Sequence, residues 1–151
     1  MWATHANHLS YGDALEHKGE SQFMAVDFLH LQDYVLLEKS LNTAVDIAYF
    51  GGTADMVDDL ARIARTFPHR VVVLTLGKDG SLAFQGDQSF AQEALPIERV
   101  VDTTGCGDAF QAGFTATYYR TQDIRASMLA GAELGRTTAL HHGATPWPTH
   151  T

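Results

Sequence analysis

The chain has 151 residues, of which 45% are hydrophobic and 19% charged, and its formal net charge is −8. This composition indicates a folded globular domain, and the negative charge argues against binding to nucleic acid or to an anionic membrane. A single cysteine excludes an internal disulfide, and no apolar run approaches membrane length, so the cytoplasm is the expected compartment.

The first 85 residues predict alternating strands and helices. Residues 1–20 are polar and rich in His and Gly, and only a short helix over Tyr11–His17 is expected there. Further on, short apolar runs predict strands and longer amphipathic stretches predict helices. The expected strands are Phe23–Phe28, Val45–Phe50, Val71–Leu76 and Ser81–Gln85, and the expected helices are Gln32–Leu41 and Thr53–Phe67.

The C-terminal part predicts two helices, Cys106–Arg120 and Ile124–Leu140. Strands that alternate with helices through short connections predict an α/β fold with a mainly parallel sheet flanked by helices. The sequence contains no internal repeat, low-complexity segment or linker. We therefore expect residues 1–151 to form one domain or most of one.

The most informative motif is Asp-Thr-Thr-Gly-Cys-Gly-Asp-Ala-Phe at 102–110, followed by Gly113-Phe114. A tight turn before a helix points the backbone N–H groups of Gly105, Cys106 and Gly107 at one position, where the helix dipole favours an anion. Asp108 falls in the first helical turn and can accept a proton from a hydroxyl. Such an arrangement suits transfer of a phosphoryl group to an alcohol. The alternative is a glycine-rich helix start with a capping Asp.

The same motif resembles the C-terminal signature of the ribokinase-like (PfkB) carbohydrate kinase family. The resemblance implies an ATP-dependent kinase that transfers the γ-phosphate to a sugar hydroxyl, with Mg²⁺ and a sugar or sugar derivative as substrate. Asp108 would be the catalytic base beside the sugar, and the amides of Gly105, Cys106 and Gly107 the anion hole. Residues 24–28 and 140–144 look most like fructoselysine 6-kinase-type members.

Two further segments resemble the nucleotide-binding parts of the family. Thr75, Gly77 and Gly80 match a nucleotide-proximal turn, although an ordinary β-turn would explain them as well. Gly143 and Ala144 match the Gly-Ala loop that lies near the adenine and a cation, although a plain terminal turn is the alternative.

The resemblance also implies metal and substrate contacts. Asp102 and Thr104, with main-chain groups of His141–Thr145, would hold a monovalent cation such as K⁺, or would only shape the turn. The family's Asn-x-x-Glu, associated with Mg²⁺, is degraded to Gly52-Thr53-Ala54-Asp55, in which Asp55 keeps the charge and Gly52 lacks the amide. Asp27 would lie near the substrate or would be a strand-end turn residue. The histidine pairs lack a third ligand for structural zinc.

Two departures from the family pattern leave alternatives open. Cys106 replaces a small residue, and is either an apolar substitute or a thiol whose pKa the helix N-terminus lowers. Family members run to about twice this length, and their N-terminal half and β-sheet lid have no counterpart here. The rival interpretation is therefore a non-catalytic nucleotide-binding remnant, and uncovered sheet would favour a homodimer or pairing with another chain. A third class, a dinucleotide-dependent oxidoreductase, needs Gly-x-Gly-x-x-Gly directly after a strand, and Gly77–Gly80 does not match this pattern.

Overall fold

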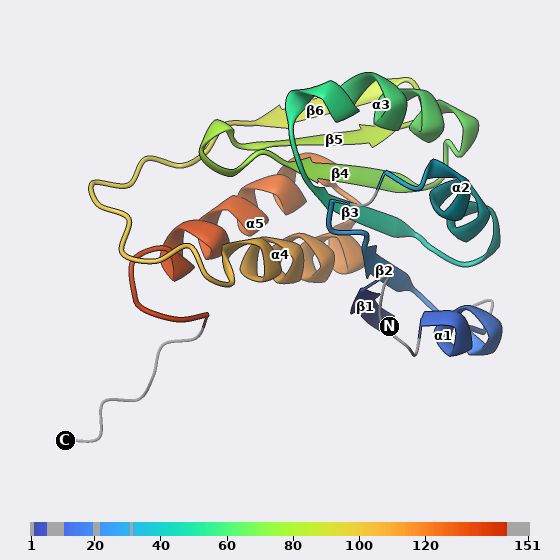
Figure 1. Ribbon diagram of the computed structural model, residues 1–151, viewed down its shortest axis with the longest axis horizontal. Coiled ribbons are helices and arrows are strands. Elements are labelled where there is room, and N and C mark those ends of the chain that lie inside the picture. The colour runs from blue at the N-terminus through green and yellow to red at the C-terminus, as the bar shows by residue number, and fades with distance from the viewer. Residues whose placement is uncertain (1, 6–10, 20–21, 31, 145–151) are drawn as a thin grey trace. The chain divides into compact units, whose positions relative to one another are not determined.

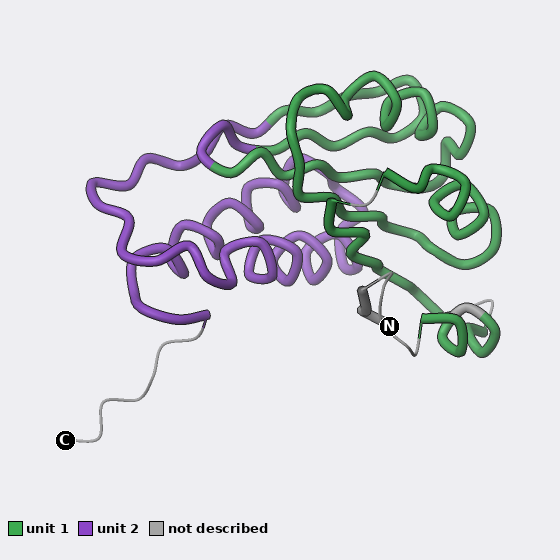
Figure 2. The backbone as a smooth tube through the Cα atoms, in the orientation of Figure 1, with its two compact units in different colours: residues 1–77, 81–91 green, residues 78–80, 92–151 purple. Residues whose placement is uncertain are grey.

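The computed structural model of the protein describes residues 2–5, 11–19, 22–30 and 32–144. These residues form two compact units, coloured separately in Figure 2. Unit 1 comprises residues 1–77 and 81–91, and unit 2 comprises residues 78–80 and 92–151.

Unit 1 is built on a sheet whose strands follow one another in chain order (Figure 1). The first four strands are parallel, with Ile47 opposite Val71, and the fifth runs antiparallel to the fourth, with Val73 opposite Ala83. The strands are β1 (Trp2–His5), β2 (Met24–Asp27), β3 (Ile47–Gly51), β4 (Val71–Thr75), β5 (Ser81–Gln85) and β6 (Gln88–Gln92). The predicted α/β fold with a mainly parallel sheet is confirmed.

Helices connect the parallel strands and cover one face of the sheet in unit 1. They are α1 (Tyr11–His17), α2 (Tyr34–Thr43) and α3 (Val57–Thr66), and a 3₁₀ turn, η1 (Ala54–Met56), precedes α3. The amphipathic character expected of the Thr53–Phe67 helix is confirmed, because the apolar stripe Leu60, Ile63 and Ala64 is fully buried in the same hydrophobic cluster as Val72 and Leu74 of β4. Burial of this stripe is what fixes α3 on the sheet.

The carboxyl ends of the parallel strands meet at one edge of the sheet. Asp27 ends β2 opposite Tyr49, and Gly51 ends β3 opposite Thr75 of β4. In parallel α/β sheets this is the edge at which ligands bind. Three of the predicted site residues, Asp27, Asp55 and Thr75, therefore lie at or just beyond it.

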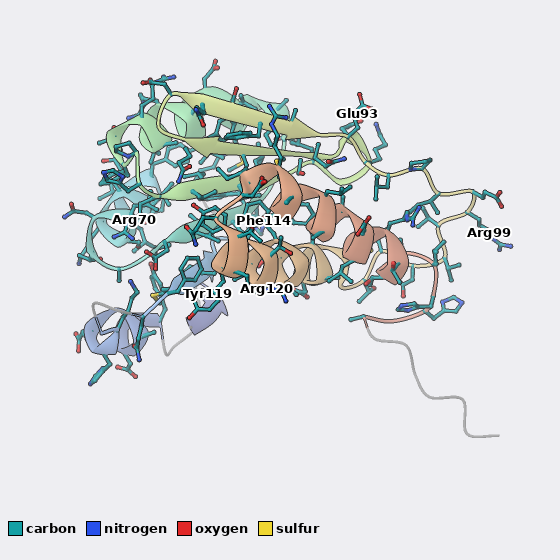
Figure 3. All side chains as sticks on the ribbon, turned by 180° about the vertical axis from the view of Figure 1, so that it is seen from behind. Arg70, Glu93, Arg99, Phe114, Tyr119 and Arg120 are labelled. Carbon is teal, nitrogen blue, oxygen red and sulfur yellow. The ribbon has the colours of Figure 1, made fainter. Side chains whose placement is uncertain are left out.

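Unit 2 contains the two predicted C-terminal helices, α4 (Cys106–Thr121) and α5 (Ile124–Thr138), packed closely against each other. A Cβ atom added to Gly113 of α4 would lie 2.7 Å from the Ala130 carbonyl oxygen of α5, so only glycine permits this approach. Phe114 is buried and lies next to Tyr118, whereas the neighbouring Tyr119 is exposed (Figure 3). The motif glycine thus serves packing between the helices.

Two strands escaped the sequence analysis. β1 lies in the polar N-terminal segment, and β6 follows β5 as the last strand of the sheet. Within the described residues, no helix is long and apolar enough to cross a membrane.

Candidate functional site

The segment before α4 is a tight turn held by glycine. Gly105 precedes the helix with φ +78°, a left-handed conformation that glycine adopts without strain. The first helical hydrogen bond runs from Ala109 N–H to the Gly105 carbonyl at 2.9 Å. Gly107 and Asp108 lie exposed in the turn between them.

Within the described part of the chain, one backbone N–H group of this turn is hydrogen-bonded and three are not. Cys106 N–H donates to the Thr103 carbonyl at 3.2 Å. Among the residues that the structure describes, the N–H groups of Gly105, Gly107 and Asp108 make no hydrogen bond. Unpaired N–H groups at a helix N-terminus can bind an anion. We call the Gly105–Asp108 segment the anion cradle.

Asp102 connects the anion cradle to a segment 41 residues further along the chain. Its Oδ1 accepts a hydrogen bond from Thr104 N–H at 2.9 Å, and its Oδ2 accepts one from Gly143 N–H at 3.0 Å. The Gly143 N–H, followed by the groups of Thr104, lowers the pKa of Asp102 from 3.8 to about 2. Asp102 therefore stays ionised at neutral pH.

The C-terminal segment also contacts the turn directly. Val101 N–H donates to the Ala139 carbonyl at 2.8 Å, and a Cβ atom built on Gly105 would lie 2.4 Å from the Ala144 Cβ. The structure thus brings together the segments 102–108 and 143–144, which the family resemblance groups around one cation. Thr145, predicted with them, lies outside the described residues.

The structure distinguishes between the two interpretations of Cys106. Burial, followed by the charge of Asp102, raises the pKa of the Cys106 thiol above its ordinary 9.0. The Sγ atom lies 3.9 Å from the Asp102 carbonyl oxygen and is partly buried. The direction of this shift favours the interpretation of Cys106 as a small apolar substitute over that of a thiol with a lowered pKa.

Asp108 has the accessibility that a catalytic base needs. Its carboxylate is exposed in the first turn of α4 and makes no hydrogen bond to any described residue. It therefore remains available to a substrate hydroxyl, and its unpaired backbone N–H lies in the same turn.

The predicted nucleotide-proximal turn follows β4 and includes a short 3₁₀ turn, η2 (Gly77–Asp79). Thr75 Oγ1 donates to the Phe50 carbonyl at 3.1 Å, which fixes the end of β4.

Gly80 has φ +92°, and a Cβ atom there would lie 2.1 Å from the Gln92 carbonyl oxygen, so no other residue fits. Lys78 is exposed and pairs with Asp79 at 2.8 Å, which raises the pKa of the lysine.

Asp27 shapes the turn that follows β2. The side chain is buried, and its Oδ1 accepts a hydrogen bond from Leu29 N–H at 2.6 Å. Leu29 has φ +55°, a strained conformation for leucine, and its carbonyl accepts a hydrogen bond from Gly51 N–H at 2.8 Å. These contacts favour the turn-forming interpretation of Asp27.

The degraded magnesium motif lies just beyond β3. A Cβ atom at Gly52 would lie 2.3 Å from the Met56 Sδ, so packing of Met56 takes the space that a larger residue would need. Asp55 is exposed and accepts a hydrogen bond from the Thr53 hydroxyl. Carboxylate and hydroxyl oxygens suit Mg²⁺, although one carboxylate is a small donor set. No group of three His, Cys, Asp or Glu in the described ranges could hold a metal ion.

The residues directly before Asp102 and after α5 carry an exposed apolar surface that no sequence motif indicated. Val100, Val101 and Leu140 are 52%, 38% and 52% exposed, and the Val101–Ala139 hydrogen bond places their two segments side by side. The signal in the sequence was the pair of valines directly before Asp102. Exposed apolar side chains on two adjoining segments offer a contact surface for an apolar group.

The mainly parallel sheet of unit 1 and the glycine turn that starts α4 in unit 2 define an α/β protein with a candidate anion site. The sequence model of the pfkB family of carbohydrate kinases matches residues 47–150, and the chain belongs to this family. It is 42% identical to a cytidine kinase of Thermococcus kodakarensis over 86 residues, which is 55% of this chain and 30% of that protein. It is 36% identical to a fructoselysine 6-kinase of Escherichia coli over 73 residues, 48% of this chain and 28% of that protein.

Solved structures confirm the ribokinase-like fold. A fructokinase from Vibrio cholerae, solved with fructose, ADP and a calcium ion, superposes with a TM-score of 0.74 at 20% identity. The superposition covers 95% of this chain and 56% of the fructokinase. The chain thus spans about half the length of this neighbour, and its matches cover about a third of the curated relatives.

Proposed function

We propose that the chain carries the phosphate-handling part of an ATP-dependent carbohydrate kinase. The Asp108 carboxylate accepts the proton of a sugar hydroxyl while the hydroxyl oxygen attacks the γ-phosphorus of ATP and the bond to ADP breaks. The N–H groups of Gly105 and Gly107 donate to the oxygens of the transferred phosphate. The observation that carries this proposal is an exposed, unpaired Asp108 beside unpaired N–H groups, in a chain of this family.

Nucleotide binding is supported by the surface around the anion cradle. Val100, Val101 and Leu140 offer apolar contact for the base, and Gly143 and Ala144 adjoin Gly105. The Vibrio cholerae fructokinase binds ADP, and this supports the same ligand here. Thr75, Gly77 and Gly80 remain proposed nucleotide contacts.

The two cations have separate proposed ligands. Asp55 and the Thr53 hydroxyl would orient water molecules of Mg²⁺ that enters with ATP, and the ion would neutralise phosphate charge. Asp102 and Thr104 remain proposed ligands of K⁺, because each carboxylate oxygen of Asp102 keeps a further lone pair. The proposed acceptor is a small sugar or sugar derivative, and we propose cytoplasmic action.

A second candidate function is nucleotide binding without catalysis. The observation that favours it is Gly52, which lacks the amide of the family motif and where the Met56 side chain lies in the space that a Cβ atom would take. A chain of this kind would bind Mg-ATP but would not transfer phosphate, alone or paired with a second chain.

An assay of ADP release separates the two candidates. The purified chain is incubated with Mg-ATP and with fructose, fructoselysine or cytidine, the acceptors named for its relatives. We expect ADP release with one acceptor and a loss of about 100-fold or more in Asp108→Asn, with ATP affinity retained. The matched control is Asp58→Asn, which alters an exposed Asp in the first turn of α3. ATP binding without ADP release would support the non-catalytic alternative.

A further inference from the structure

We propose that Asp102 is a positioning residue, which clamps the Gly143–Ala144 loop against Gly105 and so fixes the anion cradle for phosphate. We call its hydrogen bonds to Thr104 N–H and Gly143 N–H the Asp102 clamp. That the cradle binds a nucleotide phosphate rests on the proposed function. The clamp itself can be tested without nucleotide.

The clamp uses both oxygens of one carboxylate. Oδ1 receives Thr104 N–H from the turn itself, and Oδ2 receives Gly143 N–H from the segment after α5. Hydrogen bonds from N–H groups to an ionised carboxylate are stronger than those between neutral groups. Asp102 therefore joins two segments that have no other side-chain hydrogen bond between them among the described residues.

The clamped loop constrains the residue that precedes α4. Ala144 lies against Gly105, so closely that the space for a Cβ atom on Gly105 is already filled. Gly105 has φ +78° and accepts the first helical hydrogen bond, so its conformation sets the direction of the Gly107 and Asp108 N–H groups. Without the clamp, Gly105 loses the neighbour that restricts it, and the unpaired N–H groups lose their fixed orientation.

The direction in which phosphate affinity changes when Asp102 is neutralised distinguishes the clamp from a direct electrostatic effect. A carboxylate close to a phosphate site repels the phosphate, so neutralising Asp102 would tighten anion binding if charge alone mattered. The clamp predicts the opposite, weaker binding. If Asp102 acts only as a K⁺ ligand, Asp102→Asn should lower the affinity for Mg-ATP only when K⁺ is present.

The first test uses amide NMR spectra of the 151-residue chain without nucleotide. In Asp102→Asn, one N–H group must face the donor end of the side-chain amide, so we expect the signals of Gly105, Gly107 and Asp108 to shift. We also expect hydrogen exchange of the Thr104 and Gly143 N–H groups, which donate to Asp102 in the parent chain, to accelerate about tenfold or more. The control is Asp123→Asn at the start of α5, where the carboxylate accepts a hydrogen bond from Ala126 N–H at 3.0 Å. Unchanged cradle signals in Asp102→Asn would overturn the proposal.

A second variant covers the case in which Asp102→Asn does not fold. Gly143→Ala strains the other side of the clamp, because Gly143 has φ +76°, and its added Cβ atom would meet nothing within 4 Å. In Gly143→Ala, the amide signals of Gly105, Gly107 and Asp108 should shift in the same direction as in Asp102→Asn, but by a smaller amount. If they stay in place while the Gly143 region changes, the proposal is wrong.

The second test measures Mg-ATP affinity by calorimetry in potassium chloride and in tetramethylammonium chloride. We expect Asp102→Asn to bind about tenfold more weakly or worse in both salts, and Asp123→Asn to bind as the parent chain does. Equal or tighter binding by Asp102→Asn, or a loss confined to potassium chloride, would overturn the clamp. If the parent chain itself does not bind Mg-ATP, the proposed function fails, and the NMR test alone decides on the clamp.

Discussion

Gly105 and Ala144 are in such close contact that a Cβ atom on Gly105 would lie 2.4 Å from the Cβ and 2.8 Å from the Cα of Ala144. Because one of these atoms belongs to the backbone, the loop as a whole would have to move to admit a side chain. The left-handed φ of +78° at Gly105 adds a second reason for glycine. The turn before α4 and the segment after α5 thus restrict each other.

We expect Gly105→Ala to lower the free energy of unfolding by about 2 kcal/mol or more, from backbone strain and overpacking together. Chemical denaturation of the purified variant measures this change. Gly107→Ala is the matched control, because its Cβ atom meets nothing within 4 Å and alanine favours a helix. A Gly105→Ala variant as stable as the Gly107→Ala variant would show that the loop does not lie against the turn.

The pH dependence of the Gly143 amide signal tests the ionisation of Asp102. The folded-state pKa of about 2 lies below the ordinary value of 3.8, so the ionised carboxylate stabilises the folded chain. This contribution is complete above the ordinary pKa and disappears as the pH falls through the folded pKa. The Gly143 signal should therefore stay constant on acidification until the pH approaches about 2. A titration centred near the ordinary value would mean that Asp102 accepts neither N–H group.

Cys106 should react slowly with a thiol reagent at neutral pH, because its raised pKa leaves little thiolate. The rate with Ellman's reagent should fall below that of glutathione and should reach that of a free thiol after unfolding in guanidinium chloride. Faster reaction of the folded chain than of glutathione would restore the interpretation of a helix-activated thiol.

Asp27→Ala should destabilise the chain by about 1–3 kcal/mol, because it removes the acceptor of the Leu29 N–H in a buried turn. Thermal or chemical denaturation measures the loss. Asp33→Ala at the start of α2 is a useful comparison, since it removes an exposed acceptor of Leu36 N–H and should cost about 1 kcal/mol. An Asp27→Ala variant of unchanged stability would favour a role in substrate binding instead.

The sequence predicted strands β2 to β4 and helix α3 well. Continuous apolar runs in the strands, and the apolar face of α3 formed by Leu60, Ile63 and Ala64, mark buried positions directly. The sequence analysis missed β6, where the residues Gln-Ser-Phe-Ala-Gln at 88–92 are mostly exposed and contain one large apolar side chain. β1 was missed in a polar segment, because the backbone hydrogen bonds that pair it with β2 leave no pattern in the side chains. The helix predicted from Thr53 begins with a 3₁₀ turn, in which the Thr53 hydroxyl hydrogen-bonds to Asp55.

The motif at 102–108 predicted an anion-binding turn, and its backbone has the conformation for one. The family resemblance grouped Asp102 with main-chain groups of His141–Thr145 around a cation. The direct hydrogen bond from Gly143 N–H to Asp102 leaves no pattern in the sequence, since it joins a side chain to a backbone N–H group 41 residues away. The sequence left two interpretations of Cys106 open for a related reason. Helix position is visible in the sequence, whereas burial and the distance to Asp102 are properties of the fold.

The most direct test of this account is a calorimetric titration of the 151-residue chain with Mg-ATP, beside the Gly107→Asp variant. A carboxylate at position 107 would place a negative charge among the unpaired N–H groups without steric conflict, because a Cβ atom there meets nothing within 4 Å. The account predicts saturable binding by the parent chain and none by the variant, with both chains folded by circular dichroism. Absence of binding by a folded parent chain, or equal binding by both chains, would contradict it.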